Sequence, residues 1–583
     1  MENAGRRHAW LALFVFLLAA CIARQWLVPL PSSFWVDELV TAFVVAHPAH
    51  ASFAIAPQVP ASLYYWMPRI SQRLFGFSEI SYRLPSVLAM ALALFLIGRI
   101  AARLIHPQAA WFAVFACLGL RGINYFADDA RPYALGICVA AAAVLFEIRW
   151  LDRARWSDAA LFVLFAALLW RIHLIYWPFY LVFALYPLMR IAGRDTRVTW
   201  GQSLAVFAVL ALALIPVILQ SLSLLREAGA HVIASLPGFR DFQHEIRWSL
   251  VAICGGGAWL LSRKSCGRFP AASLALIGAW WLIQPIALFV FSYATGNSVF
   301  ITRYLSLAVP GSALMATAAA AISLPANRWR EASLALGIGV LLVMGHWTVR
   351  SPRHDNSDWR SAALAENHFA IAPDTPVICP SPFVEARTPV WRPDYPLPGF
   401  LYAHLPFYPI RGKVYLFPFE EADGEQYAAQ LSATTLSQSA RFIVYGGDAS
   451  VRFWQNWFMH RPELQGWQNQ VQKFGDVWLA VFTRGDGARL SDRSSGSGLA
   501  RRLPGGFRNH FNLYRKVIAQ PLVDAVFLTG IHHTLPPDSA GSFVILGNDI
   551  GVPREDGNDS ILPHPTTVVH VVDGLAVLHM TEL

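Results

Sequence analysis

Two adjacent carboxylates, Asp37 and Glu38, stand in the segment FWVDEL just after the first apolar run of the chain. A charged side chain near bilayer depth is costly unless it faces a water-filled cavity or takes part in chemistry. The alternative is an ordinary helix start, where acidic residues interact favourably with the helix dipole. The pair fits both interpretations equally well. The choice therefore depends on whether other polar residues gather on the same side of the membrane.

Three further loops carry side chains of the kinds that bind phosphate or move protons. Each has a structural alternative: acids can cap the next helix, a histidine at the membrane edge can be structural, and an arginine there can snorkel to the surface. The residues are Asp128, Asp129, Arg131 and Tyr133 in NYFADDARPYAL, Arg171 and His173 in WRIHLIYW, and Arg303 and Tyr304 in SVFITRYL.

Carboxylates, guanidinium groups and an imidazole on one face of a membrane suit one kind of chemistry. A carboxylate can act as general base on an attacking hydroxyl, which typically contributes about 10²–10⁴ in rate. Guanidinium groups match phosphate oxygens and stabilise the negative charge of a departing phosphate. Phosphate is already a good leaving group, so no general acid is needed. The set favours transfer of a group from a membrane-held lipid phosphate to an external acceptor.

Membrane helices must position these residues. The chain has 583 residues, of which 55% are hydrophobic and 14% charged, and this is too apolar for a soluble globular protein. Its first apolar run is too long for a signal peptide and lacks a small-residue cleavage site, so we expect an uncleaved helix. Roughly eleven membrane segments of about 20 residues are predicted, at 9–30, 82–105, 109–124, 132–150, 158–172, 174–190, 201–222, 247–263, 271–295, 304–324 and 331–349.

The basic residues indicate which side of the membrane faces the cytoplasm. Lys and Arg gather in alternate loops, and this bias places the N-terminus inside and Asp37 outside. The net charge of +9 is thereby explained as a topology signal, and no nucleic-acid partner is predicted. The basic segments are 6–7, 99–103, 149–155, 190–197, 263–268 and 328–330.

A different composition begins near residue 351. Apolar, β-branched runs alternate there with helix-like stretches, which predicts a small α/β domain over 351–484. An odd number of membrane helices would place this domain outside the cytoplasm. The strand-like runs are 376–381, 414–419, 441–447 and 477–483, and the helix-like stretches are 359–370 and 451–461.

The last part of the chain, 485–583, is predicted to be a linker followed by a small extension of unknown role. Residues 484–502 have the composition of a flexible linker. VVHVVDGLAVLHM is typical of a hairpin with Asp573–Gly574 at its turn. The six cysteines show no CxxC spacing, so the sequence predicts neither a zinc site nor a disulfide framework.

The motifs WVDE, DARPYAL and FITRYLSLAVPG, in this order and topology, resemble those of GT-C membrane glycosyltransferases. The branch is the bacterial one similar to protein O-mannosyltransferases and the lipid A aminoarabinose transferase. DNSDWRSAA at 355–363 is similar to the start of that branch's extracytoplasmic domain. The resemblance extends over 9–370, is loose over the α/β domain and is absent after 485. It implies a catalytic membrane domain over 1–350.

The resemblance implies an inverting transfer of a sugar from a polyprenyl-phosphate donor on the periplasmic face of the plasma (inner) membrane. Acceptors in such enzymes are cell-envelope lipids, glycans or proteins. Some members require Mg²⁺ or Mn²⁺ and others do not, so the metal stays open. By position in the motifs, Asp37 matches the general base with Glu38 beside it. Asp128 and Asp129 replace the Gln and Glu of a QEAR-type motif. The residues that match the donor pocket are Arg131, Tyr133 and His173. The residues that match the phosphate-binding segment are Arg303 and Tyr304.

Two other functions remain open from the sequence. A transporter or flippase of lipid-linked or anionic solutes would show inverted repeats and polar groups on both sides of the midplane. We find no repeat between the halves, and the polar residues cluster on one side. A polymerase or ligase of surface polysaccharide would also use lipid-linked sugars. The identity of the sugar and acceptor and the oligomeric state are not encoded in any motif.

Overall fold

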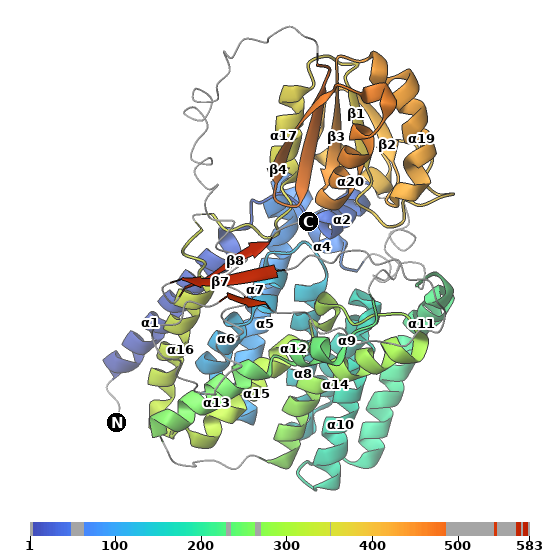
Figure 1. The fold of residues 1–583 in the computed structure, drawn as a ribbon. Helices are drawn as coiled ribbons and strands as arrows, with labels where there is room; N and C mark the ends of the chain where they lie inside the picture. Colours follow the sequence, from blue (N-terminus) through green and yellow to red (C-terminus); the bar gives the residue numbers. More distant parts are fainter. Residues whose placement is uncertain are drawn as a thin grey trace, which may run out of the picture. The chain divides into compact units, whose positions relative to one another are not determined.

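The computed structural model describes residues 4–47, 63–228, 235–262, 270–349 and 351–485, together with short strands within 542–580. The chain divides into two units, Met1–Asp486 and Gly487–Leu583, and each is described by itself. The first unit contains both the apolar helices and the α/β domain (Figure 1).

Every apolar run predicted from the sequence is helical. Their mutual packing forms one large apolar core. The helices are α1 (Ala4–Ile22) with η1 (Ala23–Leu27), α5 (Glu79–Leu104), α6 (Ala110–Leu118) with α7 (Arg121–Ala127), α8 (Tyr133–Arg153), α9 (Trp156–Ile172), η2 (Leu174–Tyr176) with α10 (Phe179–Ala192), α11 (Trp200–Ala228), α13 (Trp248–Ser262), α14 (Ala271–Thr295), η4 (Thr302–Leu305) with α15 (Ala308–Ser323), and η5 (Ala326–Arg328) with α16 (Trp329–Met344).

The predicted number of membrane spans is not confirmed, although the protein is a multi-pass membrane protein. Among the described residues, six helices are long and apolar enough to cross a bilayer, or seven if α6 and α7, bent by 80°, form one span. Helices α9, α13, α15 and α16 have only 15 to 17 residues. A span needs about 20 residues, so these four fall short by length alone. The orientation of the N-terminus stays a prediction.

Among the described residues that precede the α/β domain, three short helices outside the apolar runs were not predicted. They are α2 (Val36–Ala46), α4 (Trp66–Phe75) and α12 (Phe239–Ile246). Helix α2 matters most for the site, because Asp37 and Glu38 occupy its first turn. The backbone N–H of Trp35 donates to Glu38 Oε2 over 3.3 Å and so closes the start of this helix. The helix-start interpretation of the acidic pair is therefore correct for the local backbone.

The α/β domain is built on a five-stranded sheet in the order β2-β1-β3-β5-β4. Strands β1, β2 and β3 are parallel, whereas β5 is antiparallel to β3 and to β4. The strands are β1 (Pro376–Pro380), β2 (Lys413–Phe417), β3 (Arg441–Gly447), β4 (Gln468–Phe474) and β5 (Val477–Thr483). The helices are α17 (Trp359–Phe369), η6 (Phe400–Tyr402), α18 (His404–Phe407), α19 (Glu421–Thr434), η7 (Leu436–Gln438), α20 (Asp448–Met459) and η8 (Pro462–Leu464).

Side chains on successive strand residues point to opposite faces of this sheet, as strand geometry requires. On β1, Val377 packs into the core with Trp359 of α17, whereas Ile378 packs into the core with α19 and α20. Figure 1 accordingly shows α17 on one side of the sheet and α19 and α20 on the other. Four strands lie where the sequence predicts them. Strand β4 was missed because QNQVQKF is polar, which suits an edge strand.

One face of the sheet shares its core with the start of α2. Phe34 and Leu39 belong to the same buried cluster as Trp359 and Ile443. Polar contacts reinforce this packing: the backbone N–H of Phe34 donates to the Tyr408 hydroxyl over 2.8 Å. The domain that follows the membrane helices therefore contacts the turn that carries the acidic pair.

In the second unit, three short strands are described, in the order β6-β7-β8. Strands β6 (Ser542–Val544), β7 (Thr567–Val572) and β8 (Leu575–Met580) pair antiparallel, with Val572 opposite Leu575. This pairing confirms the predicted hairpin. Its turn, Asp573–Gly574, lies outside the described residues, as does the predicted linker over 484–502 apart from its first two residues.

Candidate active site

Asp37 lies between two arginines that come from distant parts of the chain. Its Oδ2 is 3.4 Å from Nε of Arg303, which lies in η4. Its backbone carbonyl accepts a hydrogen bond of 3.1 Å from Nη1 of Arg131, in the loop before α8. The Asp37 side chain is 21% exposed, so its carboxylate remains accessible from solution.

Asp37, Arg131 and Arg303 together carry a net positive charge. Burial alone would lower the pKa of Arg131 and of Arg303, but the negative charge of Asp37 together with the neighbouring tyrosines outweighs burial and raises both. Both guanidinium groups are therefore charged, and one carboxylate faces two cations. Arg303 also lies over the rings of Trp35 and Tyr304, each with its centroid 5.7 Å away. Such an arrangement attracts an anion, and its planar donors suit phosphate oxygens.

His173 is fully buried among aromatic rings beside the arginines. Its ring centroid lies 5.9 Å from that of Tyr133 and 5.4 Å from that of Tyr304. Burial lowers its pKa well below the usual value, and Arg131 and Arg303 lower it further, so the ring is neutral. Nδ1 accepts a hydrogen bond from the Ile175 N–H, so Nε2 carries the proton.

Several polar atoms around Asp37 are buried without a hydrogen-bond partner in the described structure. They include Nε of Arg131, the hydroxyl of Tyr133, Nε2 of His173 and Nε of Arg303. Buried polar groups in proteins are nearly always hydrogen-bonded to protein or water. Their convergence beside two guanidinium groups indicates a place for a polar, anionic ligand.

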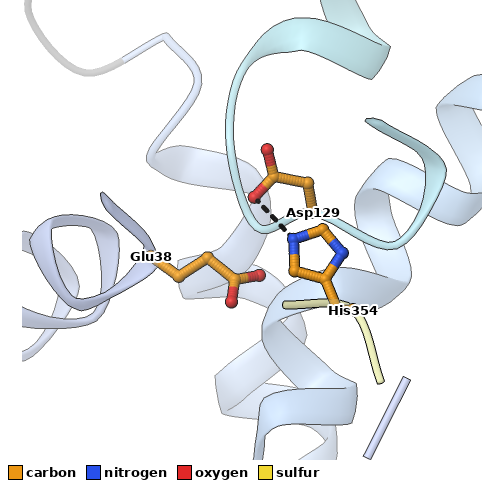
Figure 2. Close-up of side chains that lie close together, drawn as sticks. All are labelled: Glu38, Asp129 and His354. Atoms are coloured by element: carbon orange, nitrogen blue, oxygen red, sulfur yellow. Dashed lines mark ion pairs between the residues drawn. The ribbon is translucent and has the colours of Figure 1, made fainter. Parts of the chain in front are cut away.

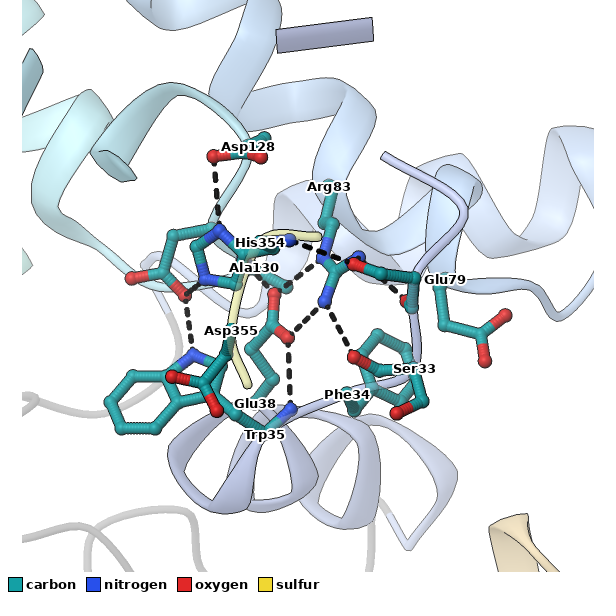
Figure 3. Close-up of polar contacts among 12 residues, drawn as sticks. Ser33, Phe34, Trp35, Glu38, Glu79, Arg83, Asp128, Ala130, His354 and Asp355 are labelled. Carbon is teal, nitrogen blue, oxygen red and sulfur yellow. Dashed lines mark hydrogen bonds and ion pairs between the residues drawn. The ribbon is translucent and has the colours of Figure 1, made fainter. Parts of the chain in front are cut away.

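Glu38, the neighbour of Asp37, has a different environment. Its side chain is fully buried, and both oxygens are saturated with hydrogen bonds (Figure 3). Oε1 accepts from Arg83 Nε and from the Ala130 N–H, each over 2.7 Å. Oε2 accepts from Arg83 Nη2 and the Trp35 N–H. Burial would raise the pKa of Glu38, but Arg83 outweighs burial and lowers it.

Arg83 fixes the segment that leads into α2. Its Nη1 donates to the carbonyls of Leu30 and Ser32 over 2.8 and 2.7 Å, and Nη2 donates to Ser33 O over 3.1 Å. Sequence reasoning missed this residue. A signal existed, because an arginine in the first turns of an apolar membrane helix is costly and implies a partner.

Asp128 and Asp129 pair with His354, which comes from the segment before α17. Asp128 Oδ1 is 3.0 Å from His354 Nδ1 (Figure 3). Asp129 Oδ1 is 3.6 Å from His354 Nε2 (Figure 2). Trp35 Nε1 also donates to Asp129 Oδ1, over 3.1 Å. Burial raises the pKa of Asp128, and it raises that of Asp129 to about 6. No sequence motif singled out His354.

Glu38, Asp129 and His354 each offer one donor atom, and these atoms lie within 4.8 Å of one another. Within the described part of the chain, these three residues are the candidate ligands of a divalent cation. Glu38 already accepts four hydrogen bonds, and Asp128 takes His354 Nδ1. Only Asp129 Oδ2 and His354 Nε2 stay without a hydrogen bond. Mg²⁺ and Mn²⁺ prefer carboxylate, carbonyl and water oxygens, whereas here a single free carboxylate oxygen stands beside an imidazole nitrogen. The set does not fit these ions.

The structure therefore divides the predicted site residues between two groups, and the second group also contains two residues that were not predicted, Arg83 and His354. The first, here called the Asp37 group, contains Asp37, Arg131, Tyr133, His173, Arg303 and Tyr304. The second, here called the Glu38 group, contains Glu38, Arg83, Asp128, Asp129 and His354. Arg171 lies in the last turn of α9, two residues before His173.

Residues 59–223 match the family model described as Dolichyl-phosphate-mannose-protein mannosyltransferase. The match covers α4 to α11, including the Asp129 loop and His173. No curated protein sequence matches the chain.

The chain also matches solved structures. Two crystal structures of ArnT from Cupriavidus metallidurans, one bound to undecaprenyl phosphate and one apo, are each 14% identical to this chain. They cover 81% and 82% of this chain and 98% of their own, with TM-scores of 0.47 and 0.48. The arabinosyltransferase EmbB from Mycobacterium smegmatis is 18% identical, covering 53% of this chain and 30% of its own, with a TM-score of 0.37.

Proposed function

We propose that this chain, which resembles the GT-C membrane glycosyltransferases, transfers a sugar from a polyprenyl-phosphate donor to an acceptor hydroxyl. The family description names a lipid-phosphate-linked sugar, and this supports the donor class. The observation that carries the proposal is the Asp37 group, in which one accessible carboxylate is flanked by Arg131 and Arg303.

The proposed reaction needs few groups. The acceptor hydroxyl oxygen forms a bond to C1 of the sugar, and the bond from C1 to the phosphate oxygen breaks on the opposite face. The configuration at C1 is thereby inverted. Asp37 takes the hydroxyl proton, and the bonding electrons leave with the polyprenyl phosphate. Arg131 and Arg303 stabilise the charge that develops on that phosphate.

His173 and the tyrosines would shape the donor pocket. A neutral His173 with a proton on Nε2 is a hydrogen-bond donor that adds no charge. Together with the unpaired hydroxyl of Tyr133, it can hold a sugar hydroxyl or a phosphate oxygen. Tyr304 lies between His173 and Arg303 and keeps both in place.

The reaction is proposed to take place on the periplasmic face of the plasma membrane. The support is the distribution of basic loops, which places Asp37 opposite the cytoplasm. A cell-envelope lipid, glycan or protein is the proposed acceptor, and the α/β domain packs against α2 where an acceptor would approach Asp37. The need for Mg²⁺ or Mn²⁺ stays a prediction, and no step above depends on a metal.

The proposal is tested with purified protein in lipid nanodiscs and a panel of polyprenyl-phosphate monosaccharides, hexosyl and pentosyl, with cell-envelope extract as acceptor. We expect release of polyprenyl phosphate from at least one donor. Failure to cleave every donor in the panel would contradict the proposed reaction. Movement of an intact donor across a vesicle bilayer, without cleavage, would support the flippase instead.

A further inference from the structure

His354 lies between α16 and α17, where the apolar helices give way to the α/β domain. Its side chain is fully buried, and its ring stacks on Tyr125 with centroids 4.3 Å apart. Its backbone N–H donates to Ser32 Oγ over 3.1 Å. The imidazole is therefore held in one orientation.

Both nitrogens of the ring face carboxylates. Nδ1 lies 3.0 Å from Asp128 Oδ1 and Nε2 lies 3.6 Å from Asp129 Oδ1. A neutral imidazole has a single N–H, so its other nitrogen would direct a lone pair at a carboxylate oxygen. Only a ring with protons on both nitrogens can donate toward both acids.

The charges around the ring favour the same protonation state. Without His354, the Glu38 group holds three buried carboxylates, Glu38, Asp128 and Asp129, and one buried cation, Arg83; Arg131 of the Asp37 group is buried as well and interacts with Asp129. The Glu38 group by itself then has an excess of two negative charges, and uncompensated buried charge is strongly destabilising. A positive charge on His354 halves the excess.

We propose that His354 is a positioning residue, held as an imidazolium between Asp128 and Asp129, and that it supplies the cation of the Glu38 group in place of a metal ion. A divalent ion at this position would have to displace hydrogen bonds from Glu38, whose oxygens are saturated. A proton on Nε2 requires no such displacement.

The position of His354 gives this cation a role in the site. Asp128 and Asp129 begin the loop that carries Arg131, and Glu38 accepts from Ala130 in the same loop. An imidazolium between the two aspartates therefore holds this loop in place and keeps the Arg131 side chain beside Asp37. This catalytic consequence rests on the proposed function, whereas the protonation state of His354 does not.

The neighbouring charges determine how stability depends on pH. Burial alone would lower the pKa of His354, but Asp128 and Glu38 outweigh it and raise it to about 10. An unfolded histidine has a pKa of about 6.5. The stabilisation is therefore complete below about pH 6.5 and is lost as pH rises toward 10. The titratable and charged groups around the ring are Glu38, Arg83, Tyr125, Asp128 and Asp129, with Arg353 and Asp355 beside it in the chain.

The first test measures the melting temperature of the purified full chain from pH 6 to pH 10. We expect His354→Asn to melt well below the wild type at pH 6 and the difference to shrink steadily toward pH 10. The control is His368→Asn, an exposed histidine at the end of α17, which should change neither value. A difference that is the same at every pH would overturn the proposal.

A variant that fails to fold would not end the test. His354→Lys keeps a positive charge and should recover part of the stability that Asn loses. Asp128→Asn removes one carboxylate partner of the ring and so lowers the pKa of His354 in the folded protein, and the loss of stability in that variant should be complete at a lower pH. Failure of both expectations would also overturn the proposal.

The second test distinguishes the proton from a metal. Metal analysis of the wild type should find no stoichiometric divalent ion that His354→Asn lacks, and EDTA should leave the melting temperature unchanged. A bound ion that disappears in the variant, with melting lowered by EDTA, would show that His354 is a ligand instead.

The third test addresses positioning. If donor cleavage is found, His354→Asn should lower kcat about 10–100-fold with a smaller change in KM, because displaced catalytic groups cost rate even at a distance. His354→Lys should restore part of kcat. An unchanged kcat would contradict the positioning role, and it would leave the glycosyltransferase proposal intact.

Discussion

Asp37 and Glu38 are neighbours on one helical turn, yet their surroundings are opposite in charge and in hydrogen bonding. Asp37 is one carboxylate beside two guanidinium groups, and several nearby donors have no partner. Glu38 is one of three carboxylates beside Arg83, and its oxygens accept four hydrogen bonds. Unpaired donors indicate a place for a ligand, whereas saturated groups indicate a scaffold.

The division follows from helix geometry. Successive residues of a helix point about 100° apart, so adjacent side chains face different neighbours. In α2 this difference directs Asp37 toward η4 and the Arg131 side chain and directs Glu38 toward α5. The predictions below test whether one group serves catalysis and the other stability.

The largest effect is expected when the charge of Asp37 is removed. Asp37→Asn should lower the rate of donor cleavage about 10²–10⁴-fold, because the general base is lost. The melting temperature should fall only modestly, since the carboxylate is partly exposed, even though it offsets the charge of Arg131 and Arg303. The control is Asp394→Asn, whose side chain is 80% exposed in the α/β domain. An unaltered rate of donor cleavage in Asp37→Asn would contradict the assignment of Asp37 as the general base.

Arg83→Met should produce the reverse pattern. Removal of the guanidinium leaves Glu38 as an unpaired buried charge, which costs about 3–5 kcal/mol. We expect a large loss of thermal stability or of folded protein in detergent. The double variant Arg83→Met with Glu38→Leu should recover much of it, because the buried charge is then absent. A stable single variant that is merely inactive would contradict the scaffold role.

Arg303→Lys should have an intermediate effect on catalysis. Lysine keeps the charge but loses the planar fork that pairs with phosphate oxygens. Loss of one such donor group typically costs about 10²–10³ in rate, and the retained charge should limit the loss to about tenfold. Steady-state kinetics with the cleaved donor checks this. If the melting temperature falls strongly while kcat hardly changes, Arg303 has a structural role and not a catalytic one.

The smallest effect is expected at His173. His173→Gln keeps a hydrogen-bond donor in place of Nε2–H, so a modest rise in KM of a few-fold is expected, comparable to a loss of roughly 1 kcal/mol for one neutral hydrogen bond. Because burial and the two arginines keep the ring neutral, the pH profile between 6 and 8 should be unchanged. If the wild-type rate falls at acidic pH and this fall is absent in His173→Gln, the wild-type ring is not neutral and the prediction is contradicted.

Local features of the chain accounted for much of the architecture. The apolar runs became helices, and the β-branched runs became β1, β2, β3 and β5. Strand β4 escaped prediction because QNQVQKF is polar. Helix α2 is apolar, but its 11 residues are about half of a membrane span, and only its start was considered from the sequence. The number of membrane spans could not be counted from hydropathy alone, because α6 and α7 are bent by 80° within one apolar run.

The sequence by itself determined that the chain is a membrane protein with an α/β domain, and it marked Asp37, Arg131 and Arg303 as residues that suit phosphate chemistry. Composition and periodicity are local properties, so they can be read along the chain. Only the tertiary structure decided that Glu38 pairs with Arg83 and that Asp128 and Asp129 enclose His354. Those partners are far apart in the chain, and a buried charge acquires its role from whichever neighbour folding brings within hydrogen-bonding distance.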